Sequence, residues 1–235
     1  MKTFLYIIFG VLLFTSPVFS QSTGYIGLSI GGGIPVNHYG NNDINDSAAG
    51  FAKAGLNFEI TFAEKISKKI GICALIRNQT NAMDAQAAEK QFAKKYPNIK
   101  WTMQADNWNI KLFMAGAYGS FPTGGDSGTS IDLKFMVGIA SSTLPGYILT
   151  GTQSGLSVTA KQNSATSSAF CYALGIGLKK NITRDLCLLI GVDYMSTNPK
   201  FENVSINFSN GTQQTISGSQ GITIFTANVG LGFRL

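Results

Sequence analysis

The chain alternates apolar and polar residues with a period of two in eight separate segments. In the last segment, Phe225, Val229 and Leu231 share one face, whereas Thr226 and Asn228 share the other. This period is typical of a β-strand whose one face is apolar. The eight predicted strands are residues 25–34, 51–62, 70–77, 107–121, 129–141, 168–178, 186–195 and 222–235.

The connections between these segments alternate in length. Three are short and rich in charged or turn-forming residues, and four are long: residues 35–50, 78–106, 142–167 and 196–221. Within the second long connection, a stretch rich in Ala, Glu, Gln and Lys predicts a helix over residues 82–96 that ends before Pro97. The alternation predicts an all-β fold: one eight-stranded antiparallel up-and-down transmembrane β-barrel with short periplasmic turns and long extracellular loops.

The N-terminus has the features of an export signal. Lys2 precedes an apolar run over residues 4–14, and small or modest side chains stand before Gln21. The run is shorter than the roughly 20 residues that a spanning helix needs. We therefore predict a cleaved signal peptide, residues 1–20, and an outer-membrane barrel domain, residues 21–235.

Composition narrows the class of partner. The formal charge is +6, but the basic residues are scattered, which argues against nucleic acid and favours outer-membrane lipid and lipopolysaccharide as partners. Cys73, Cys171 and Cys187 fall on polar strand faces, so we expect free thiols inside the barrel. No spacing of cysteines, carboxylates and the single histidine indicates a metal site or a cofactor.

Charged residues recur on the strand faces opposite the apolar ones. In a narrow barrel interior, opposite charges must pair, because an isolated buried charge is very unfavourable. We therefore predict an ion-pair network that fills the lumen, in preference to a conducting path. Its members are Lys53, Glu59, Arg77, Lys111, Asp132, Lys134 and Asp193.

Aromatic residues cluster near the ends of the predicted strands. Amphipathic rings settle at the interfaces between membrane and water, so these residues are predicted to form two girdles. They are Tyr25, Phe62, Trp108, Tyr118, Phe121, Tyr172, Tyr194 and Phe233.

Several stretches resemble a known family: residues 108–112 leading to Phe121-Pro122, residues 172–178 before 181–183, Val192-Asp193-Tyr194 and residues 227–233. They are similar to the small outer-membrane β-barrels of Gram-negative bacteria, the OmpA- and OmpX-like type, in the variety common in the Bacteroidota. The resemblance implies an outer-membrane location and recognition of the C-terminal strand by the barrel-insertion machinery. It leaves the extracellular ligand open, because family members include pores, adhesins, membrane stabilisers and lipid-modifying enzymes.

We expect a non-enzymatic barrel that stabilises the membrane or binds partners through its long loops. A soluble exported barrel with a small apolar ligand is the first alternative, and it would turn its apolar face inward. A narrow diffusion pore is the second. The third is a lipid-A-modifying enzyme that uses His38 with Asp43, Asp46 or Ser47, as the related lipid-A enzymes use a histidine near the cell exterior.

Overall fold

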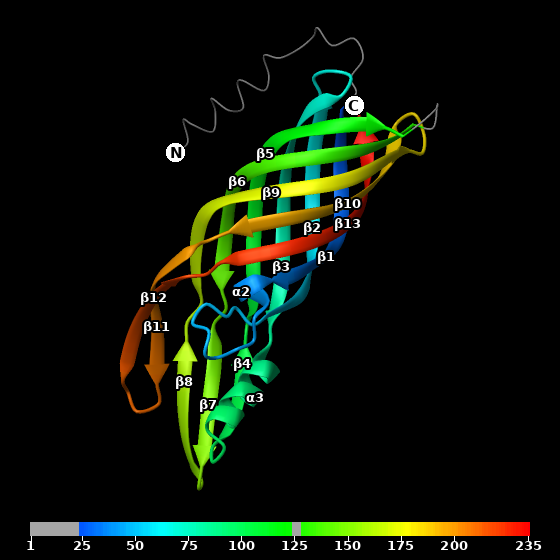
Figure 1. The fold of residues 1–235 in the computed structure, drawn as a ribbon. Coiled ribbons are helices and arrows are strands. Elements are labelled where there is room, and N and C mark those ends of the chain that lie inside the picture. The colour runs from blue at the N-terminus through cyan, green and yellow to red at the C-terminus, as the bar shows by residue number, and fades with distance from the viewer. Residues whose placement is uncertain (1–23, 124–127) are drawn as a thin grey trace.

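A closed antiparallel barrel forms most of the molecule (Figure 1). The computed structural model describes residues 24–123 and 128–235, so the predicted signal peptide lies outside the described residues. Each barrel strand pairs with the strands before and after it in the barrel, and β1 closes onto β13. The barrel strands are β1 (Tyr25–Val36), β2 (Ala52–Lys65), β3 (Ile70–Met83), β5 (Asn107–Pro122), β6 (Thr129–Leu144), β9 (Ala165–Asn181), β10 (Leu186–Thr197) and β13 (Ile222–Arg234).

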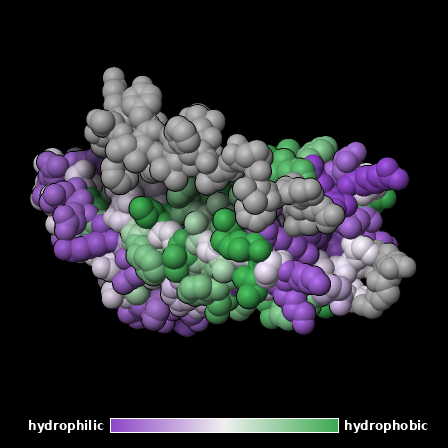
Figure 2. All heavy atoms as spheres, turned by 90° about the horizontal axis from the view of Figure 1, so that it is seen from above, coloured by the Kyte–Doolittle hydropathy of each residue, from purple (hydrophilic) through white to green (hydrophobic). Residues whose placement is uncertain are grey.

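The outer surface of the barrel carries an apolar belt, and Figure 2 shows hydrophobic side chains gathered in a band with hydrophilic ones to either side. On β6 the belt runs from Ile131 to Ile139, close to the roughly 9–11 residues with which a tilted strand crosses a bilayer core. Its exposed members include Ile26, Leu28, Ile30, Phe58, Ile60, Ile72, Ile76, Phe113, Leu133, Phe135, Ile139, Phe170, Leu174, Ile176, Ile190, Val192, Val229 and Leu231.

The belt has a sharp edge on the side of the long loops. Neighbouring strands align Ile76, Phe113, Ile139 and Phe170 as one apolar row. Two residues further along each strand, the register aligns a polar row: Asn78, Lys111, Ser141 and Ser168. The outer surface of these strands therefore changes from apolar to polar over two residues, and the strands continue beyond the polar row.

Strand β5 faces the opposite way from the sequence prediction. The sequence pattern places Trp108 in an outer girdle and Lys111 in the lumen. Instead, Ile110, Leu112 and Met114, which share the face of Trp108, are buried in the barrel. Lys111 and Phe113 lie on the outer surface. Both faces of this segment carry large apolar side chains, and the more apolar face points inward, so the alternation indicated the wrong side. Pairing with β3 decided it, because Leu112 stands opposite the inward Arg77 and Phe113 opposite the outward Ile76.

The long connections are more ordered than the sequence indicated. Their strands form a separate five-stranded sheet in the order β12-β11-β8-β7-β4, which we call the distal sheet (Figure 1). At the tip of one hairpin, Ser154 and Gly155 both have positive φ, as a tight two-residue turn requires. The distal strands are β4 (Lys100–Ala105), β7 (Tyr147–Gln153), β8 (Leu156–Gln162), β11 (Lys200–Phe208) and β12 (Gln213–Ser219).

Two helices accompany these loops. The predicted helix exists as α3 (Ala85–Lys95), and Asp84 caps it by accepting a hydrogen bond from the Ala87 backbone N–H. The short α2 (Asn37–Gly40) follows β1 at the long-loop end of the barrel. No helix in the described part of the chain has the length and apolarity to span a membrane.

Candidate functional site

A cluster of buried charges lies inside the barrel. Arg77 on β3, 2% exposed, pairs with Glu59 directly across the β2–β3 ladder. Its guanidinium also lies 2.5 Å from a carboxylate oxygen of Asp193 on β10 and donates to Thr226 Oγ1 at 3.1 Å. Glu59 accepts a further hydrogen bond from Thr61 Oγ1 at 2.6 Å. One cation therefore holds two carboxylates from strands that are far apart in the sequence, which only closure of the barrel brings together.

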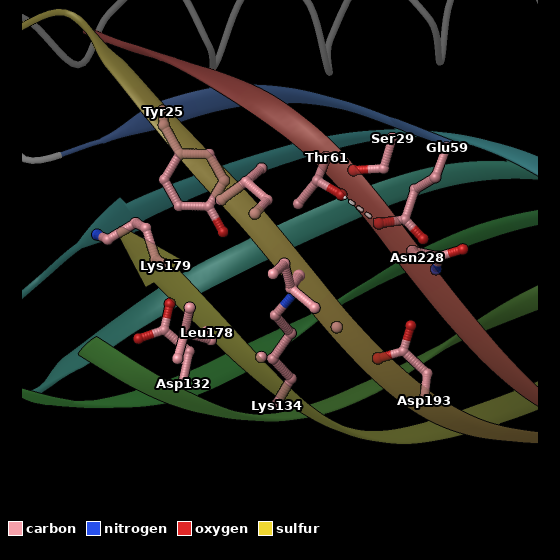
Figure 3. A pocket seen from close by; sticks show the side chains of 14 residues that line it. Tyr25, Ser29, Glu59, Thr61, Asp132, Lys134, Leu178, Lys179, Asp193 and Asn228 are labelled. Atoms are coloured by element: carbon pink, nitrogen blue, oxygen red, sulfur yellow. Dashed lines mark hydrogen bonds between the residues drawn. The ribbon is translucent and has the colours of Figure 1, made fainter. Parts of the chain in front are cut away.

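Two more predicted members of the network lie near this cluster. Asp132 and Lys134 line a cavity that Glu59 and Asp193 also line (Figure 3). Asp132 accepts a hydrogen bond from Ser130 Oγ at 3.1 Å. The cavity measures about 30 Å³, enough for a water molecule but not for a continuous channel.

The structure corrects two predicted members of the network. Lys111 is exposed on the outer surface, because the pairing of β5 turns its odd-numbered residues outward. Lys53 is also exposed, because the register of β2 shifts between Ala52 and Gly55 and interrupts the alternation there. The predicted members that face inward are thus Glu59, Arg77, Asp132, Lys134 and Asp193, and Lys179 lines the same cavity.

The structure also corrects three predicted girdle residues. Tyr25, Trp108 and Tyr118 are 2–3% exposed and point into the barrel. Tyr25 alternates with the outward Ile26, and the other two follow the inward face of β5; Gly71, opposite Tyr118, leaves space for that ring. The remaining rings lie on the outer side of the barrel strands, where their function as a girdle stays a prediction: Phe62, Phe121, Tyr172, Tyr194 and Phe233.

Apolar side chains fill the barrel toward the long loops. Trp108 donates from Nε1 to the Gly50 carbonyl at 3.0 Å, which ties the first loop to the barrel interior. Its ring meets Tyr39 of α2 edge-on at 5.3 Å between centroids, and Phe201 of β11 at 6.3 Å. We call this apolar cluster around Trp108 the plug. Its further members, all below 3% exposed, are Ile110, Leu112, Met114, Met195, Ile222 and Ile224.

Tyr39 and Phe201 are parts of the interior that no sequence signal indicated. Both residues belong to segments predicted as loops, and no periodic pattern marks them. Tyr39 is 0% exposed because the first loop folds over the barrel mouth, where Gln220 Nε2 also donates to the Ala48 carbonyl at 2.8 Å. The mouth is therefore covered by two loops that hydrogen-bond to each other.

His38 lies in the first loop beside Asp46, and the two side chains form a hydrogen bond of 2.8 Å. Asp43 instead accepts hydrogen bonds from Asn45. Within the described hydrogen bonds, His38 has a carboxylate partner and no serine partner. No group of three or more metal-ligating side chains comes together in the residues described.

The contact between His38 and Asp46 predicts a pH response of the first loop. The His38 hydrogen bond, with help from the Ala48 N–H and Asn41, lowers the pKa of Asp46 from 3.8 to about 2. A lowered carboxyl pKa stabilises the folded loop above the ordinary pKa, and this contribution is lost as pH falls from about 4 through 2. We expect His38→Ala to raise the pKa of Asp46, as measured by NMR titration of its carboxyl carbon, while Ser47→Ala leaves it near 2.

Comparison with known proteins supports the fold. No family model matches the chain, and no curated protein matches its sequence. A major outer membrane protein from Thermus thermophilus superimposes with a TM-score of 0.51 at 10% identity, over 89% of this chain and 99% of that one. Neisserial surface protein A (TM-score 0.46, 12% identity, 91% and 98%) and Ail of Yersinia pestis (0.43, 12%, 90% and 99%) are also similar.

These similarities concern the fold, because the sequence identities are very low. The chain has the fold of the small eight-stranded outer-membrane β-barrels, so the predicted fold class is confirmed. That the protein is of the Bacteroidota type stays a prediction from the sequence alone.

Proposed function

We propose that the protein is a non-enzymatic integral barrel of the outer membrane of a Gram-negative bacterium, and that it presents the distal sheet outside the cell as a binding surface. The apolar belt is the observation that carries this proposal. Side chains such as Ile30, Phe113 and Phe170 are 61–66% exposed, and a bilayer would cover them.

The outward belt argues against the soluble alternative. A soluble ligand-binding barrel would be expected to present polar side chains to water and an apolar cavity within. Here the interior holds Glu59, Arg77 and Asp193, while large apolar side chains cover the outside. The orientation of the side chains therefore favours a lipid environment.

The filled interior argues against a diffusion pore. The charge cluster and the plug around Trp108 occupy successive levels of the lumen, and α2 and the first loop cover its mouth. A barrel of this size has space only for its own side chains. The proposed role therefore lies at the outer surface and not in transport.

Lys111 suggests how the barrel meets its lipid partner. It stands in the polar row directly beyond the apolar belt, where a lysine can keep its stem beside acyl chains and extend its ammonium group toward phosphates. We propose that this edge lies at the headgroups of outer-membrane lipid or lipopolysaccharide. Recognition of β13 by the barrel-insertion machinery belongs to the same proposal.

The proposal is tested by fractionating cells that express the full chain and comparing the gel mobility of the outer-membrane fraction before and after boiling. We expect recovery in the outer membrane and a mobility that changes on boiling, because a closed barrel stays compact in detergent until heat unfolds it. Recovery in the soluble periplasmic or secreted fraction would contradict the proposal and favour the soluble barrel.

A further inference from the structure

An apolar groove lies on the distal sheet, outside the barrel. Trp101 of β4, Leu149 of β7 and Val158 of β8 contribute to its wall, and Ile99, Leu156 and Phe208 contribute further apolar surface. The groove has a volume of about 430 Å³, within the roughly 300–1,000 Å³ typical of small-molecule sites. Its lining contains one polar side chain, Gln153.

The groove has a defined shape, because its aromatic wall is supported from behind. The Trp101 ring packs against Phe92 and Tyr96 of α3, with centroid distances of 5.2 and 6.1 Å. Gly151 stands opposite Trp101 in the β4–β7 ladder, and a Cβ there would come within 2.8 Å of the ring. The glycine thus lets the indole lie close against the sheet.

No described residue covers the apolar surface of this groove, which lies away from the membrane belt. Leu156 is 79% exposed and Val158 60% exposed, and both belong to a hairpin of the distal sheet beyond the polar row of the barrel. Exposed apolar surface concentrated in a concave site is typical of ligand binding. The belt explains the exposed residues of the barrel, but it does not explain these.

The polar groups around the groove indicate the charge of its ligand. The Nε1–H of Trp101 is buried and has no hydrogen-bond partner among the described residues. At the end of α3, Lys94 and Lys95 directly precede Tyr96, whose ring contacts Trp101. An apolar wall with two lysines at one end suits an amphiphile with an anionic head.

We propose that this groove binds the acyl chain of a single-chain amphiphile with an anionic head, of the fatty-acid class. The chain lies along Trp101, Leu156 and Val158, and the carboxylate lies toward the lysines at the end of α3. This inference rests on the proposed function, because it names the class of ligand that the distal sheet would bind outside the cell.

The test uses the full protein in lipid nanodiscs with brominated dodecanoic acid, because bromine quenches indole fluorescence only on contact. The chain has two tryptophans, and Trp108 is 2% exposed inside the barrel, so saturable quenching reports on Trp101. Acid dissolved in the bilayer does not reach the distal sheet. We expect saturable quenching that disappears in Trp101→Phe.

Two glutamate variants test whether the acid binds in the groove or elsewhere on the distal sheet. Val158→Glu places a negative charge in the groove and is expected to weaken binding by at least about tenfold. Ser157→Glu adds the same charge one residue away, on the opposite face of β8, and is expected to leave binding unchanged. Equal affinity of both variants, or quenching that never saturates, would overturn the proposal.

The methyl ester of the same acid tests the anionic head. We expect the ester to bind at least about tenfold more weakly, and equal binding would overturn the choice of an anionic ligand.

Boiling-dependent gel mobility of each variant is measured on the same samples. An inserted barrel that does not bind the acid contradicts the groove alone, whereas a chain that does not insert contradicts the proposed function.

Discussion

Replacement of Arg77 by methionine is expected to lower the free energy of unfolding by about 3–5 kcal/mol, the typical loss when one partner of a buried ion pair is removed. Methionine fills much of the volume of arginine, so the main effect is electrostatic. Glu59 and Asp193 would then remain buried without the cation that both contact. Urea-induced unfolding of the protein in lipid vesicles, followed by fluorescence, measures the change.

Lys111→Met is the matched control for this prediction. The sequence placed Lys111 in the same network, but the structure places it on the outer surface. We expect its replacement to change the free energy of unfolding by no more than about 0.5 kcal/mol, as is usual for surface positions. Equal losses in the two variants would contradict the assignment of Arg77 as the centre of the charge cluster.

Trp108→Ala is expected to cost about 3–5 kcal/mol, because it removes a large buried ring and leaves a cavity. Its indole also holds the Gly50 carbonyl and packs against Tyr39 and Phe201. The first loop should therefore lose its attachment to the barrel mouth. Urea unfolding measures the loss of stability, and amide hydrogen exchange in residues 37–51 measures the release of the loop.

Phe113→Ala provides the comparison for β5. Phe113 is 61% exposed in the apolar belt, where lipid replaces the contacts that the ring gives up. We expect a loss of about 1 kcal/mol or less, with unchanged hydrogen exchange in the first loop. A larger loss from Phe113→Ala than from Trp108→Ala would restore the orientation that the sequence pattern favoured.

The outward face could be predicted for strands with one apolar face, but not for a strand with apolar residues on both faces. In the middle of β1 and β13 the outer face is apolar and the inner face is small or polar, as in Leu28, Ser29 and Ile30, so the alternation identified the lipid side. On β5 the inner Leu112 and the outer Phe113 are both apolar. The local pattern favoured the wrong orientation, because the more apolar face of β5 fills the barrel interior, and pairing with β3 determines which face points inward.

The sequence predicted a buried cluster of paired charges, but it did not predict all of its members or their contacts. Glu59, Arg77 and Asp193 lie on polar faces of well-patterned strands, and the structure places all three inside the barrel. That Arg77 also contacts Asp193 could not be predicted, because β10 meets the hairpin of β2 and β3 only when β1 pairs with β13. The bulge near Lys53 gave no warning in its sequence either, since a shift of register depends on the partner strand.

The sequence alone determined the eight strands, the alternation of short and long connections and the helix α3, because two-residue and helical periods arise from the geometry of the backbone itself. The tertiary structure decided the facing of β5, the contacts of Arg77, the plug under α2 and the distal sheet with its groove. These features depend on contacts between segments that are distant in the chain, and such contacts have no local period that a sequence can display.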